Sequence, residues 1–287
     1  MNPGLVPGFI SFLGHVVSIC VRYCAPMPRT VIAQISDPHI TGPGDELFEG
    51  SDPVGNLTKA LQHASKRSNA VLITGDCVAR AGTDNEYRGF SDVLASVDVE
   101  VALCAGNHDE SEKMQRLYSL PSRNGRLDYV LAVPEGKVVV MDSARLGRGD
   151  GALDADQLEW LDSELSDGVP TLIAMHHPCF ATGGKALDSV RLDDASIAGL
   201  TDVVARHDVL AVVSGHAHMT LSAPFAGTTA YICPSVAYEF GFQGRNLMHR
   251  PGLPQYMEYS WGSGGSAFMA RVVTVAPDDQ WFIMESF

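Results

Sequence analysis

Carboxylate and imidazole side chains recur along the chain in short fragments whose spacing suits metal binding. Asp37 and His39 are separated by one residue, and His216 and His218 repeat this spacing. In an extended backbone, alternate side chains project to the same side, so each pair could hold one cation. Asp76 follows a glycine. A compact turn at this point would let the two oxygens of its carboxylate contact two metal ions.

Asn107 and His176 complete the candidate ligand set with an amide oxygen and an imidazole. Carboxylate, imidazole and amide donors together suit Mn, Fe, Zn or Co rather than Ca. A single ion would leave several donors unused, so the sequence predicts two adjacent metal ions. Such a pair can share a hydroxide that attacks a phosphate ester, and it can neutralise the non-bridging oxygens of the ester. The candidate ligands are Asp37, His39, Asp76, Asn107, His176, His216 and His218.

Each fragment on its own also has an ordinary structural explanation. Asp37 could cap a turn, Asp76 could be a loop acid, and Asn107 could be a turn residue in left-handed backbone. His176 and its neighbour His177 could be histidines of the core. The functional interpretation therefore depends on whether one fold gathers all the fragments.

The fragments follow short apolar runs that are typical of buried strands. These runs are residues 31–36, 70–74, 99–105, 171–175 and 209–213. Helical patterns lie between them, at residues 53–67, 84–96, 111–117, 154–165 and 193–207. In the fourth helix, Asp154 can serve as the N-cap, and Leu158, Leu161 and Leu165 share one face. Alternation of this kind predicts an α/β fold with ligands at the carboxyl ends of the strands.

The composition restricts the kind of partner. Acidic side chains exceed basic ones, and the net charge of −14 disfavours a groove for nucleic acid. An anionic substrate therefore needs a local cation. The 6 cysteines show no CxxC pair, which favours buried free thiols over disulfides or a cysteine-rich zinc site. No GxSxG elbow or GxxxxGK[ST] loop is present.

The first 26 residues form a separate extension, either a mis-assigned start or a loosely attached arm. Residues 5–21 are apolar but contain Pro7 and Gly14, so a membrane span is not expected. No Lys or Arg precedes Arg22, so the positively charged start of a secretory signal is missing. A cytoplasmic protein is expected, with residues 27–287 as a single catalytic domain. The Gly-, Pro- and Tyr-rich segment 240–266 is interpreted as a late loop at the active site or an interface.

The fragments in chain order carry a family resemblance. They resemble the calcineurin-like metallophosphoesterase superfamily over residues 31–240. Within it, the chain looks like the bacterial class III cyclic-nucleotide phosphodiesterases and related glycerophosphodiesterases. The fragments are Asp37-x-His39, Gly75-Asp76, Gly106-Asn107-His108-Asp109, His176-His177-Pro178 and Gly215-His216-Ala217-His218.

The resemblance implies a fold of two packed mixed β-sheets flanked by helices, a four-layer sandwich. It implies that Asp37, His39, Asp76 and His218 hold the first metal ion. It implies that Asp76, Asn107, His176 and His216 hold the second, with Asp76 as the bridge. His108 would contact the phosphate or the leaving oxygen and would be catalytic together with Asn107.

Two neighbouring positions complete this comparison. Strand alternation would point His177 away from His176. Cys179 stands where a second proline is common in the family, and this difference is expected to alter the substrate-facing loop.

These inferences predict a dinuclear-metal-dependent phosphodiesterase that hydrolyses a small phosphodiester such as a 3',5'-cyclic nucleotide. The alternatives are a glycerophosphodiesterase, a broad phosphodiesterase, a phosphomonoesterase, or a non-catalytic sensor of metal or nucleotide. Segments 41–53, 180–191 and 240–266 would set substrate choice. The last contains aromatic residues that could stack a nucleobase, although a homodimer contact or local packing is favoured. These residues are Phe240, Phe242, Tyr256, Tyr259 and Trp261, and His249 could approach substrate from the same segment.

Overall fold

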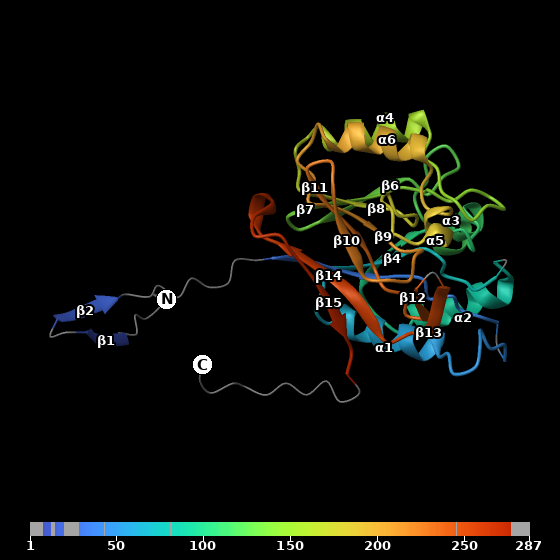
Figure 1. The fold of residues 1–287 in the computed structure, drawn as a ribbon, viewed down its shortest axis with the longest axis horizontal. Coiled ribbons are helices and arrows are strands. Elements are labelled where there is room, and N and C mark those ends of the chain that lie inside the picture. The colour runs from blue at the N-terminus through green and yellow to red at the C-terminus, as the bar shows by residue number, and fades with distance from the viewer. Residues whose placement is uncertain are drawn as a thin grey trace.

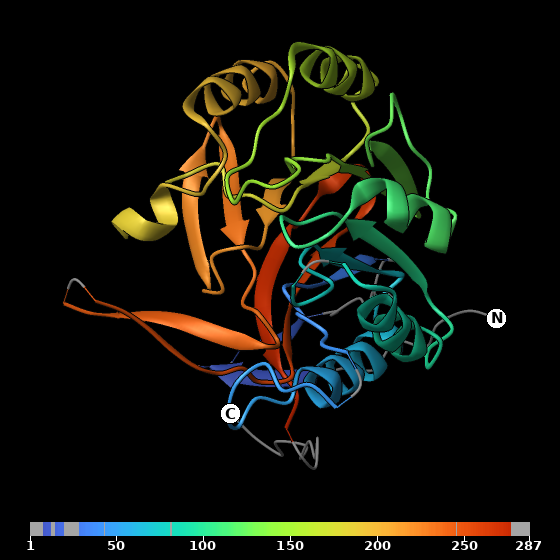
Figure 2. The same ribbon diagram turned by 90° about the vertical axis from the view of Figure 1, so that its right-hand side faces the viewer.

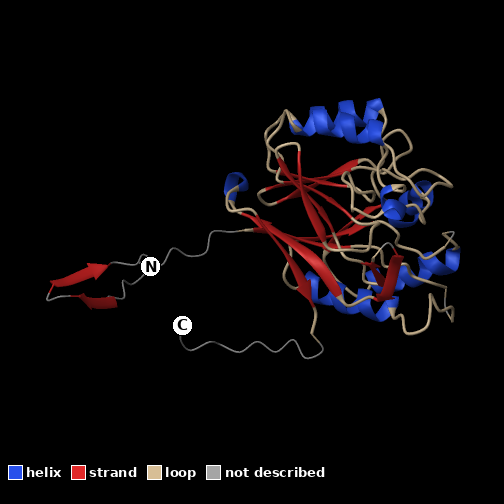
Figure 3. Cartoon of the chain, viewed as in Figure 1, coloured by secondary structure: helices blue, strands red, loops and turns tan. Residues whose placement is uncertain are grey.

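A computed structural model describes residues 8–12, 15–19, 29–42, 44–80, 82–244 and 246–276, the first two of these ranges by their backbone alone. Two β-sheets lie face to face between two outer layers of helices (Figure 1). Colouring by secondary structure shows the two sheets at the centre and helices on both outer sides (Figure 3). The predicted four-layer α/β sandwich is confirmed.

The first sheet has five strands in the order β15-β14-β3-β4-β5. Its strands β3, β4 and β5 are parallel, and β14 pairs antiparallel with β3. The strands are β3 (Thr30–Ile35), β4 (Ala70–Thr74), β5 (Glu100–Cys104), β14 (Gln255–Trp261) and β15 (Met269–Thr274). The apolar runs predicted for β3, β4 and β5 match these bounds to within one residue at each end.

The second sheet has six strands in the order β10-β11-β9-β8-β7-β6. Strands β7, β8, β9 and β11 are parallel, and the two edge strands are antiparallel. The strands are β6 (Tyr129–Val133), β7 (Gly136–Val140), β8 (Thr171–Ala174), β9 (Ala211–Ser214), β10 (Leu221–Phe225) and β11 (Thr228–Ile232). Of these strands, only β8 and β9 were predicted.

Side-chain alternation on the strands divides the core into three layers. Ala70 and Leu72 of β4 point toward the second sheet, where they pack with Leu172 of β8. Val71 and Ile73 of the same strand point outward to a layer of helices. Each buried strand therefore contributes to two apolar layers, which explains its continuous apolar sequence.

Three helices contribute to the apolar cluster outside the first sheet, and two cover the second sheet. The first group is α1 (Pro53–Ser65), α2 (Asp84–Leu94) and α3 (Ser111–Tyr118). The second group is α4 (Ala155–Leu165) and α6 (Asp194–Val204), and a short helix α5 (Lys185–Asp188) lies between them in sequence. The predicted N-cap is confirmed: Asp154 accepts the backbone amide of Gln157 at 2.9 Å.

Segment 240–266 is not a loop, contrary to the expectation from its Gly and Pro content. Strand β12 (Tyr238–Gln243) pairs antiparallel with β13 (Asn246–Pro251), and this hairpin extends from the body of the molecule (Figure 2). Next come β14 and a short 3₁₀ turn, η1 (Ser263–Gly265). Tyr256, Tyr259 and Trp261 are buried on β14. Local packing therefore accounts for these three aromatic residues.

The N-terminal extension contains two short strands within the part of the chain that is described. Strand β1 (Gly8–Phe12) pairs antiparallel with β2 (His15–Ile19). Cys20 and Cys24 lie outside the described residues. The remaining cysteines are buried free thiols, as predicted: Cys77, Cys104, Cys179 and Cys233. No helix among the described residues is long and apolar enough to cross a membrane.

Candidate metal centre

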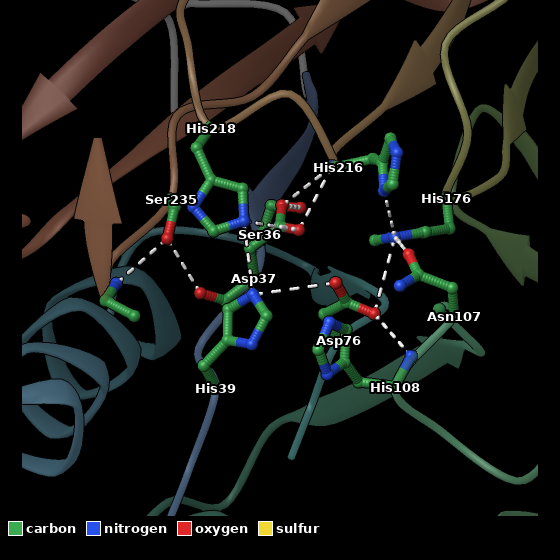
Figure 4. Close-up of polar contacts among 12 residues, drawn as sticks. Ser36, Asp37, His39, Asp76, Asn107, His108, His176, His216, His218 and Ser235 are labelled. Carbon is green, nitrogen blue, oxygen red and sulfur yellow. Dashed lines mark hydrogen bonds and ion pairs between the residues drawn. The ribbon is translucent and has the colours of Figure 1, made fainter. Parts of the chain in front are cut away.

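The predicted ligands meet at one edge of the two sheets, although they are far apart in sequence (Figure 4). Each follows the carboxyl end of a strand: β3, β4 and β5 in the first sheet, and β8 and β9 in the second. Parallel strands deliver their carboxyl ends to the same edge, so these five strands bring the fragments together. In Figure 4, Asp76 lies between two groups of side chains.

The backbone at these strand ends adopts an uncommon conformation. Five of the seven predicted ligands have positive φ angles, a region that non-glycine residues rarely occupy. The angles are 51° at Asp37, 43° at His39, 49° at Asp76, 66° at His216 and 50° at His218. The paired residues therefore converge because the chain turns sharply at each of them, and the predicted extended backbone is wrong there. Strain of this kind concentrates at functional sites.

Two glycines allow the strand ends to approach each other. Gly75 has a φ of 85°, and a Cβ atom there would lie 2.5 Å from Nδ1 of His176. A Cβ atom at Gly106 would lie 2.2 Å from Oδ1 of Asp76. Any larger residue at either position would displace a predicted ligand, which gives a physical reason for the Gly-Asp and Gly-Asn pairs.

The first group of donors consists of Asp37, His39, Asp76 and His218, all buried, with ligand atoms within 4.8 Å of one another. Nε2 of His39 lies 3.1 Å from Nε2 of His218 and 3.5 Å from Oδ2 of Asp76. Nε2 of His218 lies 3.3 Å from Oδ1 of Asp37. These four residues are the set that the resemblance implies for the first metal ion.

The second group is centred on His176. Its Nε2 lies 3.1 Å from Oδ1 of Asn107, 3.0 Å from Nδ1 of His216 and 3.4 Å from Oδ1 of Asp76. The two oxygens of Asp76 therefore face different groups, Oδ2 the first and Oδ1 the second. This arrangement matches the set implied for the second ion, with Asp76 shared.

The tautomers of two histidines show that the donors suit a cation. Nδ1 of His218 lies 2.8 Å from the carbonyl oxygen of Tyr238, and Nδ1 of His176 lies 2.8 Å from that of Thr74. A carbonyl oxygen only accepts hydrogen bonds, so each Nδ1 carries a proton, and the neutral form of either imidazole presents its lone pair at Nε2. These lone pairs converge with carboxylate and amide oxygens, which are also acceptors. A positive ion between them satisfies all of them.

The pKa directions reflect the same concentration of charge. Burial raises the pKa of Asp76, but the neighbouring His176 and His39 outweigh burial and hold this pKa well below its usual range. Burial lowers the pKa of His39 to about 3 and that of His216 to about 4. Burial also opposes protonation of His176, but Asp76 raises its pKa to about 9. The carboxylates thus remain charged and require positive charge from a proton or a metal ion.

His108 lies beside both groups without joining either. Its backbone amide donates to Oδ1 of Asp76 at 3.0 Å, and its ring contacts the ring of His39 edge-on at 4.9 Å. The residue is half-buried. Its side chain can therefore reach a substrate at the mouth of the centre.

His177 does not simply point away from the site, as strand alternation suggested. Its ring lies 4.8 Å from the ring of His216, and His176, His177 and His216 form a group that could hold a metal ion. Nδ1 of His177 lies 2.9 Å from the hydroxyl of Ser143. The alternation argument is wrong because β8 ends at Ala174, before the histidine pair.

Three supporting residues lie around the donors. Asp109 accepts the backbone amides of Gly106, Cys77 and Val78, and burial raises its pKa to about 7. The hydroxyl of Ser235 donates to the carbonyl oxygen of Asp37. Ser143 was missed entirely. The sequence contained no signal for it, because it lies far from every fragment.

Cys179 lies in the apolar cluster beneath α4 and α6. Because this side chain packs in the core, it does not support the expected effect on a substrate-facing loop.

Two known proteins are similar to this chain in sequence. A cAMP/cGMP dual specificity phosphodiesterase of Mycobacterium tuberculosis is 29% identical over 248 residues, which cover 78% of this chain and 77% of that protein. A probable glycerophosphodiester phosphodiesterase of Arcobacter nitrofigilis is 27% identical over 197 residues, 66% of this chain and 71% of that protein.

A solved structure shares the fold. A dimetal phosphatase from Danio rerio superposes with a TM-score of 0.60 at 16% identity, covering 84% of this chain and 98% of that one. The family model for calcineurin-like phosphoesterases matches residues 30–220, which include the whole of both donor groups. The chain therefore belongs to the calcineurin-like phosphoesterase family of hydrolases.

Proposed function

We propose that this protein is a dinuclear-metal-dependent phosphodiesterase that hydrolyses 3',5'-cyclic nucleotides. The observation that carries the proposal is the position of Asp76, whose two carboxylate oxygens face two separate donor groups. The relative from Mycobacterium tuberculosis, named for activity on cAMP and cGMP, supports the choice of substrate.

Asp37, His39, Asp76 and His218 would hold one ion, and Asp76, Asn107, His176 and His216 the other. Their mixture of oxygen and nitrogen donors suits Mn, Fe, Zn or Co. When bound, such ions supply Lewis acidity that activates water and neutralises phosphoryl oxygens. This local positive charge also reconciles an anionic substrate with a net charge of −14.

The residues of the chain orient the reaction. The backbone amide of His108 donates to Oδ1 of Asp76, and the half-buried His108 ring packs edge-on against the ring of His39. From there its imidazole can donate a proton to the departing alkoxide. Asn107 belongs to the second donor group, where its Oδ1 lies 3.1 Å from Nε2 of His176.

The test compares three substrates on one preparation of the full-length protein: 3',5'-cAMP, glycerophosphoethanolamine and p-nitrophenyl phosphate. We expect the highest kcat/KM for cAMP, loss of turnover on chelation, and recovery with Mn²⁺. A higher kcat/KM for either other substrate would assign the protein to that class instead. Metal binding without turnover of any substrate would favour a sensor.

The proposal also covers the cellular compartment of the enzyme. The cysteines Cys77, Cys104, Cys179 and Cys233 are unpaired and buried, and free thiols are typical of reducing compartments. We infer a cytoplasmic enzyme on this ground. Fractionation of cells producing the protein checks the inference, and recovery outside the cytoplasmic fraction would contradict it.

A further inference from the structure

One face of the β12–β13 hairpin is aromatic and apolar. Side chains alternate along each strand, so Tyr238, Phe240 and Phe242 share one face of β12. Their cross-strand partners on β13 are Pro251, His249 and Leu247. The opposite face includes the ion pair between Arg250 and Glu239. The hairpin therefore presents two chemically different surfaces.

The aromatic face begins at the metal centre. The ring of Tyr238 lies 4.1 Å from that of His218 and 5.2 Å from that of His39. The ring of Phe240 lies 5.0 Å from that of His218. Two residues of the first donor group thus contact the hairpin directly, so these rings are near a substrate that approaches this group from the hairpin side.

A residue from another part of the chain extends this surface. Phe48 contacts Tyr238 edge-on at 5.7 Å and His249 at 5.1 Å. Phe48, Tyr238 and Phe240 are half-buried, and His249 is exposed. We call Phe48, Tyr238, Phe240 and His249 the ring row. Its members retain exposed surface at the edge of the centre, unlike the aromatic residues buried on β14.

We propose that the ring row stacks the nucleobase of the substrate. This inference rests on the proposed function. It assigns the residues that favour a substrate carrying a nucleobase over one carrying a glycerol group. Flat π faces bind bases by stacking and do not require a specific hydrogen-bond pattern. A row of this kind therefore accepts both adenine and guanine.

The reach of a cyclic nucleotide decides which rings take part. Its base is one ribose away from the phosphorus, so the rings that contact the metal ligands, and the rings beside those in turn, are close enough. Phe242 is two residues beyond Phe240, roughly 7 Å farther along the strand. It lines an outer cleft of about 840 Å³ with Gly183, Gly184, Lys185 and Leu247. The outer cleft thus lies beyond the position of the base.

The test measures inhibition of bis(p-nitrophenyl) phosphate hydrolysis by 5'-AMP and by ribose 5-phosphate, which lacks the base. The wild-type protein should bind AMP about 10-fold more tightly than ribose 5-phosphate, as expected for one stacked base. Phe48→Ala and His249→Ala should reduce the ratio of the inhibition constants for ribose 5-phosphate and AMP to about 2-fold or less. Neither side chain contacts a proposed metal ligand in the ring contacts above, and metal content should be unchanged.

Phe242→Ala is the matched control, because it removes the same ring from the same face of the hairpin. It should leave the ratio at its wild-type value. An unchanged ratio in both Phe48→Ala and His249→Ala would overturn the inference, and loss of the ratio in Phe242→Ala would place the base in the outer cleft. Failure of the proposed function is separate: it would appear as absent cAMP turnover, whatever the ratio of the two inhibitors.

Discussion

Oδ1 of Asp76 lies 3.4 Å from Nε2 of His176, and the Nδ1 of this histidine lies 2.8 Å from the carbonyl oxygen of Thr74. The same carboxylate reaches His39 with its other oxygen. Asp76 is therefore the one side chain that belongs to both donor groups as we assign them. Substitution of Asp76 is therefore the most direct test of this assignment.

Asp76→Asn should remove metal from both sites. Asparagine keeps the shape of the side chain but replaces one oxygen with a nitrogen that cannot donate a lone pair to an ion, and it removes the negative charge. We expect less than one ion per chain by elemental analysis and a loss of activity of at least about 10³-fold, comparable to removal of a central electrostatic group. Asp45→Asn, at an exposed carboxylate outside the donor groups, is the control. Retention of two ions by Asp76→Asn would disprove the bridge.

His108→Ala should separate catalysis from metal binding. The His108 side chain belongs to neither donor group, so metal content should stay at the wild-type level. The rate should fall about 10²-fold or more for substrates with poor leaving groups, because these need a proton donor. It should fall much less for p-nitrophenyl esters. Loss of metal from this variant would instead make His108 a ligand.

Asp128→Asn should stabilise the protein at neutral pH. Oδ1 of Asp128 accepts from the amide of Asp142 and from Gln157, whereas its buried Oδ2 has no partner among the described residues. Burial raises the pKa of this carboxyl from 3.8 to about 6. The folded state therefore binds the proton more tightly, and its stability falls as the pH rises from about 4 to about 6.

The asparagine variant lacks this titration, and it keeps an oxygen for both donors. We expect it to be more stable than the wild type by about 1–3 kcal/mol at pH 7.5, with the difference shrinking toward pH 4.5. Urea unfolding at both pH values measures this. For comparison, Asp156 is hydrogen-bonded to Arg123, which lowers its pKa, so Asp156→Asn should lose stability at neutral pH. If Asp128→Asn changes the free energy of unfolding by the same amount at both pH values, titration of Asp128 is excluded as the cause.

Deletion of residues 1–26 should leave an active enzyme. Both donor groups lie within residues 37–218, and the family match begins at residue 30. We expect kcat and metal content to stay within about 2-fold of the full-length protein, because surface changes away from the core and the site have small effects. Size-exclusion chromatography and cAMP turnover check this. Aggregation or inactivity of the truncated protein would show that the extension belongs to the catalytic domain.

The sequence determined the candidate ligands because their types and their positions after apolar runs are local features. Asp37, Asp76 and His176 follow strands that are buried on both faces, and such strands are recognisable from their continuous apolar residues. The cap of α4 was predictable for the same reason, since Asp154 and Gln157 are three residues apart. Strands β12 and β14 were missed because Gly and Pro in this segment resemble a loop.

Only the tertiary structure decided how these residues meet. The positive φ angles at Asp37 and His39 occur where strand ends pack closely, with a Cβ atom at Gly215 falling 2.5 Å from Oδ2 of Asp37, and no local pattern reveals this packing. The division of Asp76 between two donor groups depends on distances between residues as far apart as positions 39 and 176. The contact of the hairpin with His218 likewise depends on long-range packing. Residue types thus specify the chemistry, and the fold sets its geometry.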